Sequence, residues 1–196
     1  MSWMKILLPL TAIRCFYRTN CMHVIAGIII FLITVLGTEQ AATGIGVDCL
    51  IDKYNDYADA QQRFQNETHN LILLFNQGYS EVSELYRDDQ LARIERNRLA
   101  ARYLLAHKID AVHFKKSMNI WLDLTEDDRT LIASHSEGFK ELERKIEKFR
   151  SRPPHPDGDG LREMMRNKIV MSEEFIRLTK ELQHRMNKIN AVTCKQ

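Results

Sequence analysis

Apolar side chains recur at helical spacing through most of the chain between Val47 and Gln196. The clearest stretch steps by three and four residues, the spacing of a helix face that packs in a bundle. Its members are Leu50, Tyr54, Tyr57, Gln61, Phe64, Thr68, Leu71, Phe75, Val82 and Leu85. They predict one helix of roughly 35 residues, about 50 Å long at 1.5 Å per residue. Gly78 falls on this face, where it costs about 1 kcal/mol relative to alanine and favours a kink.

Three further helices follow from the same periodicity. A turn near 87–89 starts the second helix, whose apolar face is Leu91, Ile94, Ala101, Leu105, Ile109 and Val112, continuing to Trp121. Thr125 is a predicted N-cap, because three acidic residues follow it and complement the helix dipole. The third face is Leu131, His135, Phe139, Leu142, Ile146 and Phe149. A loop of prolines and glycines at 153–160 ends this helix. The fourth face is Met164, Met171, Phe175, Leu178, Leu182 and Ile189.

Together these helices predict an all-α fold, an elongated antiparallel four-helix bundle with up-down-up-down order. Short connections favour antiparallel neighbours, so the start of the first helix and the end of the fourth should lie at the same end. The third helix is too short to cover its neighbours along their full length. Another segment must therefore cover the remaining apolar surface, or that surface stays open.

The first 38 residues contain no acidic residue and include, near their end, an apolar run, Val24–Leu36, with basic residues on its amino side. This pattern is typical of an export signal. It divides the chain into a basic segment at 1–21, a hydrophobic signal or anchor helix with linker at 22–46, and an extracytoplasmic domain at 47–196. Two interpretations fit. Residues 22–37 are retained as a membrane anchor with the amino terminus in the cytoplasm, or the signal is cleaved, after Gly46 or after Gly37, and the domain is secreted. Met4 and Met22 are alternative start sites.

The four cysteines agree with export. Cys15 and Cys21 precede the apolar run, whereas Cys49 and Cys194 lie near opposite ends of the domain. In an oxidising compartment such a pair predicts a disulfide, and the antiparallel arrangement brings its two ends together. Free thiols, or a bridge between two chains, are the alternatives.

Charge and motifs exclude several functions. Three of the 28 basic residues and one of the 26 acidic residues precede Val47, so the charges of the domain balance. A nucleic-acid-binding surface needs a basic excess, and we expect no nucleic-acid partner. We find no phosphate loop, nucleophile elbow or Cys-x-x-Cys motif, so we expect neither an enzyme nor a cofactor. Glu181 with His184, and Asp110 with His113, have di-iron spacing. They point away from the apolar faces, so we expect no metal site.

Other residues remain candidates for function. His135 lies on the apolar face of the third helix, where a core histidine could make the fold pH-sensitive; a satisfied buried or frayed-end histidine is the alternative. Met165, Ile169 and Ile176 form a second apolar face on the fourth helix, which predicts an interface with a partner or a more central helix. Asn66 begins a glycosylation triplet that matters only in a glycosylating host.

The main hypothesis is a non-enzymatic helical protein, tethered to a membrane through residues 22–37 or secreted, that binds another protein in an inhibitor or immunity, assembly or scaffold role. The binding surface would be the second face of the fourth helix or the loop at 153–160. A membrane-anchored helical bundle also resembles the ligand-binding domain of bacterial chemoreceptors, which implies a sensor of pH or ligand that signals through a partner. An anchor followed by an exported helical domain resembles inner-membrane phage spanins in topology, which implies a role in envelope lysis.

Overall fold

A computed structural model describes residues 44–194. The described residues form six α-helices and no β-strand: α2 (Gly44–Phe75), α3 (Ser80–His107), α4 (Glu126–His135), α5 (Glu137–Arg150), α6 (Gly158–Met164) and α7 (Glu173–Ala191). This confirms the all-α class. No helix in this part of the chain is both long enough and apolar enough to cross a membrane. The predicted signal or anchor at 22–37 lies outside the described residues.

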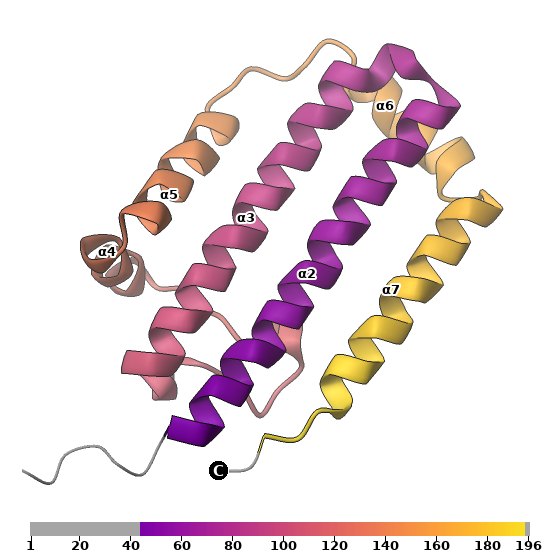
Figure 1. Cartoon of the computed structure of the whole chain (residues 1–196). Helices are drawn as coiled ribbons and strands as arrows, with labels where there is room; N and C mark the ends of the chain where they lie inside the picture. Colours follow the sequence, from indigo (N-terminus) through magenta and orange to yellow (C-terminus); the bar gives the residue numbers. More distant parts are fainter. Residues whose placement is uncertain (1–43, 195–196) are drawn as a thin grey trace, which may run out of the picture. The chain divides into compact units, whose positions relative to one another are not determined.

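The four longest helices lie beside one another in the order α5, α3, α2, α7 (Figure 1). The central pair, α2 and α3, is joined by a short turn and is antiparallel. We call the end of the domain with the start of α2 and the end of α7 the base, and the end with the turn between α2 and α3 the tip. The α5 helix packs on α3 and α7 packs on α2, on opposite sides of the central pair.

The first helix is nearly as long as predicted, but its predicted end is wrong: α2 ends at Phe75 and does not continue to Leu85. The chain turns at Asn76–Tyr79, where the Asn76 side chain accepts a hydrogen bond of 2.8 Å from the backbone N–H of Gly78. Asparagine and glycine in this pattern favour turns, because the short amide side chain replaces a backbone partner. The turn expected at 87–89 instead lies inside α3. Val82 therefore contacts α2 from a second helix rather than continuing its apolar face.

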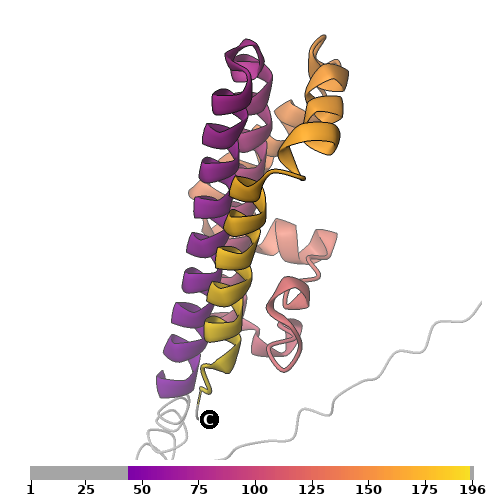
Figure 2. The same ribbon diagram turned by 90° about the vertical axis from the view of Figure 1, so that its right-hand side faces the viewer.

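The second predicted helix ends earlier than expected, at His107. Residues 108–125 form short 3₁₀ turns and one isolated bridge between Val112 and Leu122. Trp121 is almost completely buried in this segment, and its indole N–H donates a 2.9 Å hydrogen bond to the carbonyl of Lys116. The irregular segment lies at the base and α6 at the tip, on the same side of the α2–α3 pair (Figure 2). These two parts cover apolar surface that the short third helix was expected to leave open.

The predicted N-cap at Thr125 is confirmed. Its hydroxyl accepts from the backbone N–H of Asp128 at 3.1 Å, and the Asp128 carboxylate accepts from the N–H of Thr125 at 3.3 Å. This reciprocal pair is a capping box. Lys108 adds an ion pair to Asp128 at 2.8 Å, and its hydrogen bond lowers the pKa of that carboxyl. The third predicted helix then breaks at Ser136, which caps α5 separately.

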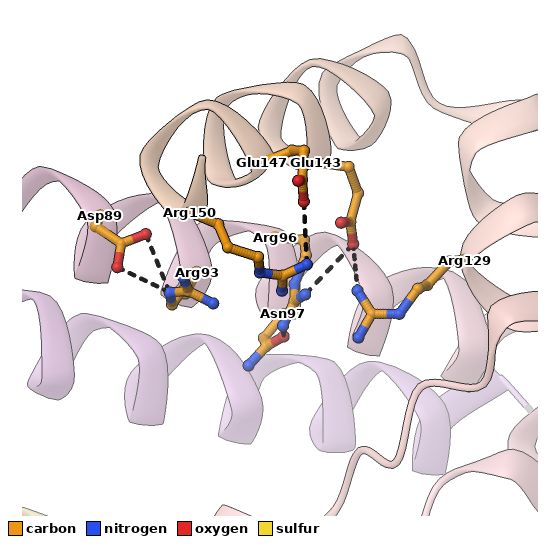
Figure 3. Close-up of polar contacts among 8 residues, drawn as sticks. All are labelled: Asp89, Arg93, Arg96, Asn97, Arg129, Glu143, Glu147 and Arg150. Carbon is orange, nitrogen blue, oxygen red and sulfur yellow. Dashed lines mark hydrogen bonds and ion pairs between the residues drawn. The ribbon is translucent and has the colours of Figure 1, made fainter. Parts of the chain in front are cut away.

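Glu143 of α5 connects that helix to α3 and α4 (Figure 3). Its carboxylate accepts from Arg96 of α3 at 3.3 Å and from Arg129 of α4 at 2.7 Å. Arg96 is largely buried, and this burial lowers the pKa of its guanidinium. A buried charge is costly when it is unpaired. Glu143 therefore keeps α5 in place against α3 by neutralising Arg96.

Two separate apolar clusters fill the interior. The base cluster contains Leu50, Tyr54, Tyr57, Ala60, Ala100, Ala101, Leu104, Leu105, Val112, Met118, Trp121, Ile132, Phe139 and Ile189. The tip cluster contains Leu71, Ile72, Val82, Leu161, Met164 and Ile169. At the tip, α6 approaches so closely that a Cβ at Gly160 would lie 2.7 Å from the hydroxyl of Tyr79. Only glycine fits there without a shift of the Tyr79 side chain.

Candidate functional site

A groove lies at the tip between α3, the end of α5 and the proline-rich loop, which crosses from α5 to α6 (Figure 1). Its volume is about 540 Å³, within the range of ligand-binding clefts. The groove is lined by Glu81, Glu84, Leu85 and Asp88 of α3, by Lys145 and Phe149 of α5, and by Arg152, Pro153, Pro154, His155 and Pro156 of the loop. The loop contains residues 153–157 of the predicted breaker cluster at 153–160, whereas Gly158–Gly160 begin α6.

One wall of the groove is aromatic and cationic. The ammonium of Lys145 lies 5.8 Å from the centre of the Phe149 ring, and the guanidinium carbon of Arg152 lies 5.0 Å from it. At these distances the positive charges are attracted to the electron-rich ring face. The charged groups of Lys145 and Arg152 therefore lie beside the Phe149 ring, where a polypeptide bound in the groove could contact them.

The opposite wall is acidic. Arg87 pairs with Glu84 at 2.9 Å and with Asp88 at 2.8 Å, and the hydrogen bond to Asp88 is the main reason that its pKa is raised. Glu81 is 89% exposed and lies 3.9 Å from Nε2 of His155. The Nδ1 atom of His155 accepts a 3.1 Å hydrogen bond from the N–H of Asp157. The neutral imidazole consequently carries its proton on Nε2, toward Glu81.

The groove is therefore lined by charges of both signs and by apolar side chains of phenylalanine, leucine and proline. Its lining contains no serine, threonine or cysteine that could act as a nucleophile beside His155. Such a surface suits an extended polypeptide, whose side chains alternate in character, better than a small apolar molecule.

The predicted interface on the fourth helix is not one continuous surface. Ile169 is completely buried in the tip cluster and Met165 packs partly buried against it, whereas Ile176 is 43% exposed. A π-helical turn at Met165–Ile169, closed by the Val170 N–H to Met165 carbonyl bond, shifts the phase of the helix. Residues 170–172 then separate it from α7. The prediction assumed one regular helix from Met165 to Ile176, which the structure does not have. Of the three predicted interface residues, only Ile176 is exposed.

His135 is not a core residue. It is exposed at the end of α4, where its Nδ1–H donates to the carbonyl of Leu131 at 3.0 Å. Its ring also lies 5.4 Å from the ring of Tyr103. The prediction assumed one helix through this region, and the break at Ser136 turns His135 outward. The core placement is therefore wrong.

The buried histidine of the described residues is His69, which sequence analysis missed. It lies on α2 facing α3, is 8% exposed, and its Nδ1 is 3.0 Å from the hydroxyl of Ser83. Its burial could have been predicted only from the turn at Asn76–Tyr79, which the helix periodicity did not reveal. With that turn, α3 packs on a second face of α2, and the position after Thr68 becomes buried.

Cys49 and Cys194 form a disulfide in the structure, with their Cα atoms 5.7 Å apart. Beside it, the ammonium of Lys53 donates to the carbonyls of Val192 at 2.7 Å and Asn190 at 3.3 Å. These contacts hold the end of α7 at the start of α2. Cys15 and Cys21 lie outside the described residues.

The metal-site candidates stay apart from one another. His113, His184, Asp110 and Glu181 are all exposed, and Asn66 is exposed on α2. Within residues 44–194, no three histidine, cysteine, aspartate or glutamate side chains are close enough to hold a metal ion.

No family model, curated protein or solved structure matches the chain.

Proposed function

We propose that this chain is a non-enzymatic extracytoplasmic protein that binds another protein through the groove at its tip. It is tethered to a membrane by residues 22–37, or secreted after cleavage of that segment. The domain is the antiparallel up-down-up-down helical unit of the sequence hypothesis, with its binding surface at the loop of residues 153–160. An inhibitor or immunity, assembly or scaffold role is consistent with such a surface.

The position of the groove supports this proposal. The α2 helix begins at Gly44, which follows the predicted anchor at 22–37 in the sequence, and the groove lies at the other end of the α2–α3 pair. The 32 residues of α2 rise by about 48 Å at 1.5 Å per residue. A tethered domain of this kind carries the groove away from its attachment point. A partner in the same compartment can then reach it.

A photo-crosslinking amino acid at position 149 tests the proposal in the native host. We expect one discrete adduct with a single protein, identified by mass spectrometry, because Phe149 lies in the groove. The same amino acid at Ser134, which is exposed on α4, is the matched control and should give no discrete adduct. A third position, Ile176, tests the surface that remains on α7.

The outcomes separate the two surfaces. An adduct at 149 but not at 134 or 176 supports the groove. An adduct only at 176 places the interface on α7 and contradicts the groove. No discrete adduct at either 149 or 176, from protein that is exported and folded, contradicts protein binding.

A sensor of pH that acts through a partner is the second candidate function. Buried His69 favours it, because burial disfavours the charged imidazole and so links the protonation of His69 to the packing of the tip. The predicted sensor residue, His135, does not support it, because it is exposed.

A further inference from the structure

His69 and Ser83 form a buried polar contact between α2 and α3 close to the turn at the tip. His69 is 8% exposed and Ser83 is 2% exposed. The Ser83 hydroxyl lies 3.0 Å from Nδ1 of His69 and 3.1 Å from the carbonyl of Ser80. A neutral imidazole can donate to this hydroxyl or accept from it, and both arrangements satisfy the contact. The pair is thus suited to an uncharged histidine.

Protonation of His69 would place a charge in this interface. Burial is the main cause that lowers the pKa of His69. The charged groups that act on the ring are all on α3: Arg87 lowers the pKa further, whereas Glu84 and Asp88 raise it. Both carboxylates already pair with Arg87. They therefore offset only part of the cost of a charged imidazole.

The contact lies inside the packing that holds α6 and the π-helical turn. Val82 precedes Ser83, and Leu71 and Ile72 closely follow His69; all three belong to the tip cluster. Residues 158–169 contribute the other three members, Leu161, Met164 and Ile169. Next to His69, the Thr68 hydroxyl is buried without a hydrogen-bonding partner. Separation of α2 from α3 at this level would remove the surface on which residues 158–169 rest.

We propose that His69 makes the tip an acid-responsive switch, in which its protonation loosens the α2–α3 contact and releases residues 158–169 from the tip cluster. Release uncovers the apolar side chains of Leu71, Ile72 and Val82. It also moves the proline-rich loop, and so changes the groove. The switch is a property of the tip itself and does not depend on the groove having a partner.

The direction of the response follows from linkage. His69 binds a proton less readily in the closed tip than in an open one, so acid favours the open tip. The closed state keeps its full stability above about pH 6.5, the ordinary pKa of histidine, and loses it progressively as the pH falls below that value. The opening equilibrium changes by up to about tenfold per pH unit in this window.

Hydrogen exchange of the purified disulfide-bonded protein at pH 7.5 and pH 5.5, corrected for the intrinsic pH dependence of exchange, tests the switch. We expect amides in 66–90 and 158–172 to lose protection at pH 5.5, by up to about tenfold, while amides at 50–60 keep theirs. H69Q should abolish the loss, because glutamine can bond to Ser83 but does not titrate. The matched control H135Q, a change at an exposed histidine, should keep it.

The proposal is overturned if the wild-type tip shows no loss, or if H69Q loses protection as the wild type does. Should H69Q fail to fold, the titration of the His69 ring in the wild-type protein, followed by NMR, decides the question. A pKa below the ordinary value of about 6.5 supports the switch. A pKa at or above that value contradicts it.

Discussion

The base and the tip of the domain bury their helices by different means. The base cluster has fourteen buried residues, and the Cys49–Cys194 bridge and the Lys53 contacts close it. The tip cluster has six, with a short α6 and a π-helical turn on top of it. Because local opening follows the amount of buried apolar contact, the tip should open at a lower free energy than the base. We therefore expect the base to hold the domain together while the tip opens locally.

The two ends also differ in the groups that respond to acid. At the base, the hydrogen bond from Lys108 lowers the pKa of Asp128, so its contribution to stability is lost only as the pH falls below about 4, the ordinary pKa of an aspartate. At the tip, burial lowers the pKa of His69, and its contribution is lost already below about pH 6.5. Mild acid should therefore affect the tip alone.

Among the variants considered, removal of the disulfide should lower the free energy of unfolding most. The bridge joins residues separated by 145 positions. In the chain-entropy model, closing so long a loop stabilises the folded state by about 3–5 kcal/mol. We expect the double variant C49S/C194S to lose about that much free energy of unfolding in denaturant titrations, with faster exchange at the base. A loss below about 1 kcal/mol would show that packing alone holds the base.

Two matched isoleucines compare the clusters directly. Ile132 at the base and Ile169 at the tip are both completely buried. I132A should lower the global free energy of unfolding by about 2–5 kcal/mol, the usual cost of an isoleucine cavity. I169A should lower it less, since the tip can open on its own, and should instead raise exchange in 158–172. Equal global losses would show that base and tip unfold as one unit.

The smallest predicted effect concerns the capping box of α4, at the base. T125A removes the hydroxyl that accepts from the N–H of Asp128, and should cost about 1 kcal/mol in the free energy of unfolding. T125S keeps an acceptor and should restore most of it. If both variants lose the same amount, the cap contributes through packing of the methyl group rather than through its hydrogen bond.

Sequence alone was sufficient where a local signal has one structural meaning. The Thr125 cap, the break in the helical structure after α5 and the pairing of the two domain cysteines follow from caps, breakers and helix directions. Helix periodicity was insufficient at the tip, because Val82 and Leu85 continue the phase of Leu71 across the turn at Asn76–Tyr79. A turn that preserves the phase cannot be distinguished from a continuous helix by spacing.

Only one side of the groove could be predicted from the sequence, because the turn at Asn76–Tyr79 was not recognised. The proline-rich loop was recognised, but the acidic wall was not, because Glu81 and Glu84 were assigned to a helix that should have continued past the tip. The interface prediction failed at Ile169 because a π-helical turn has no clear signature in the spacing of apolar residues. His69 was missed because the face of α2 that it occupies is buried only when α3 turns back.

Native-state hydrogen exchange of the oxidised protein at neutral pH tests the central claim most directly, because it measures opening free energies along the whole domain. The account predicts that amides of α2 near Tyr54 exchange only through global unfolding, whereas amides of α6 and the following π-helical turn exchange through a local opening of lower free energy. Equal opening free energies at both places would contradict the division of the domain into a fixed base and a mobile tip.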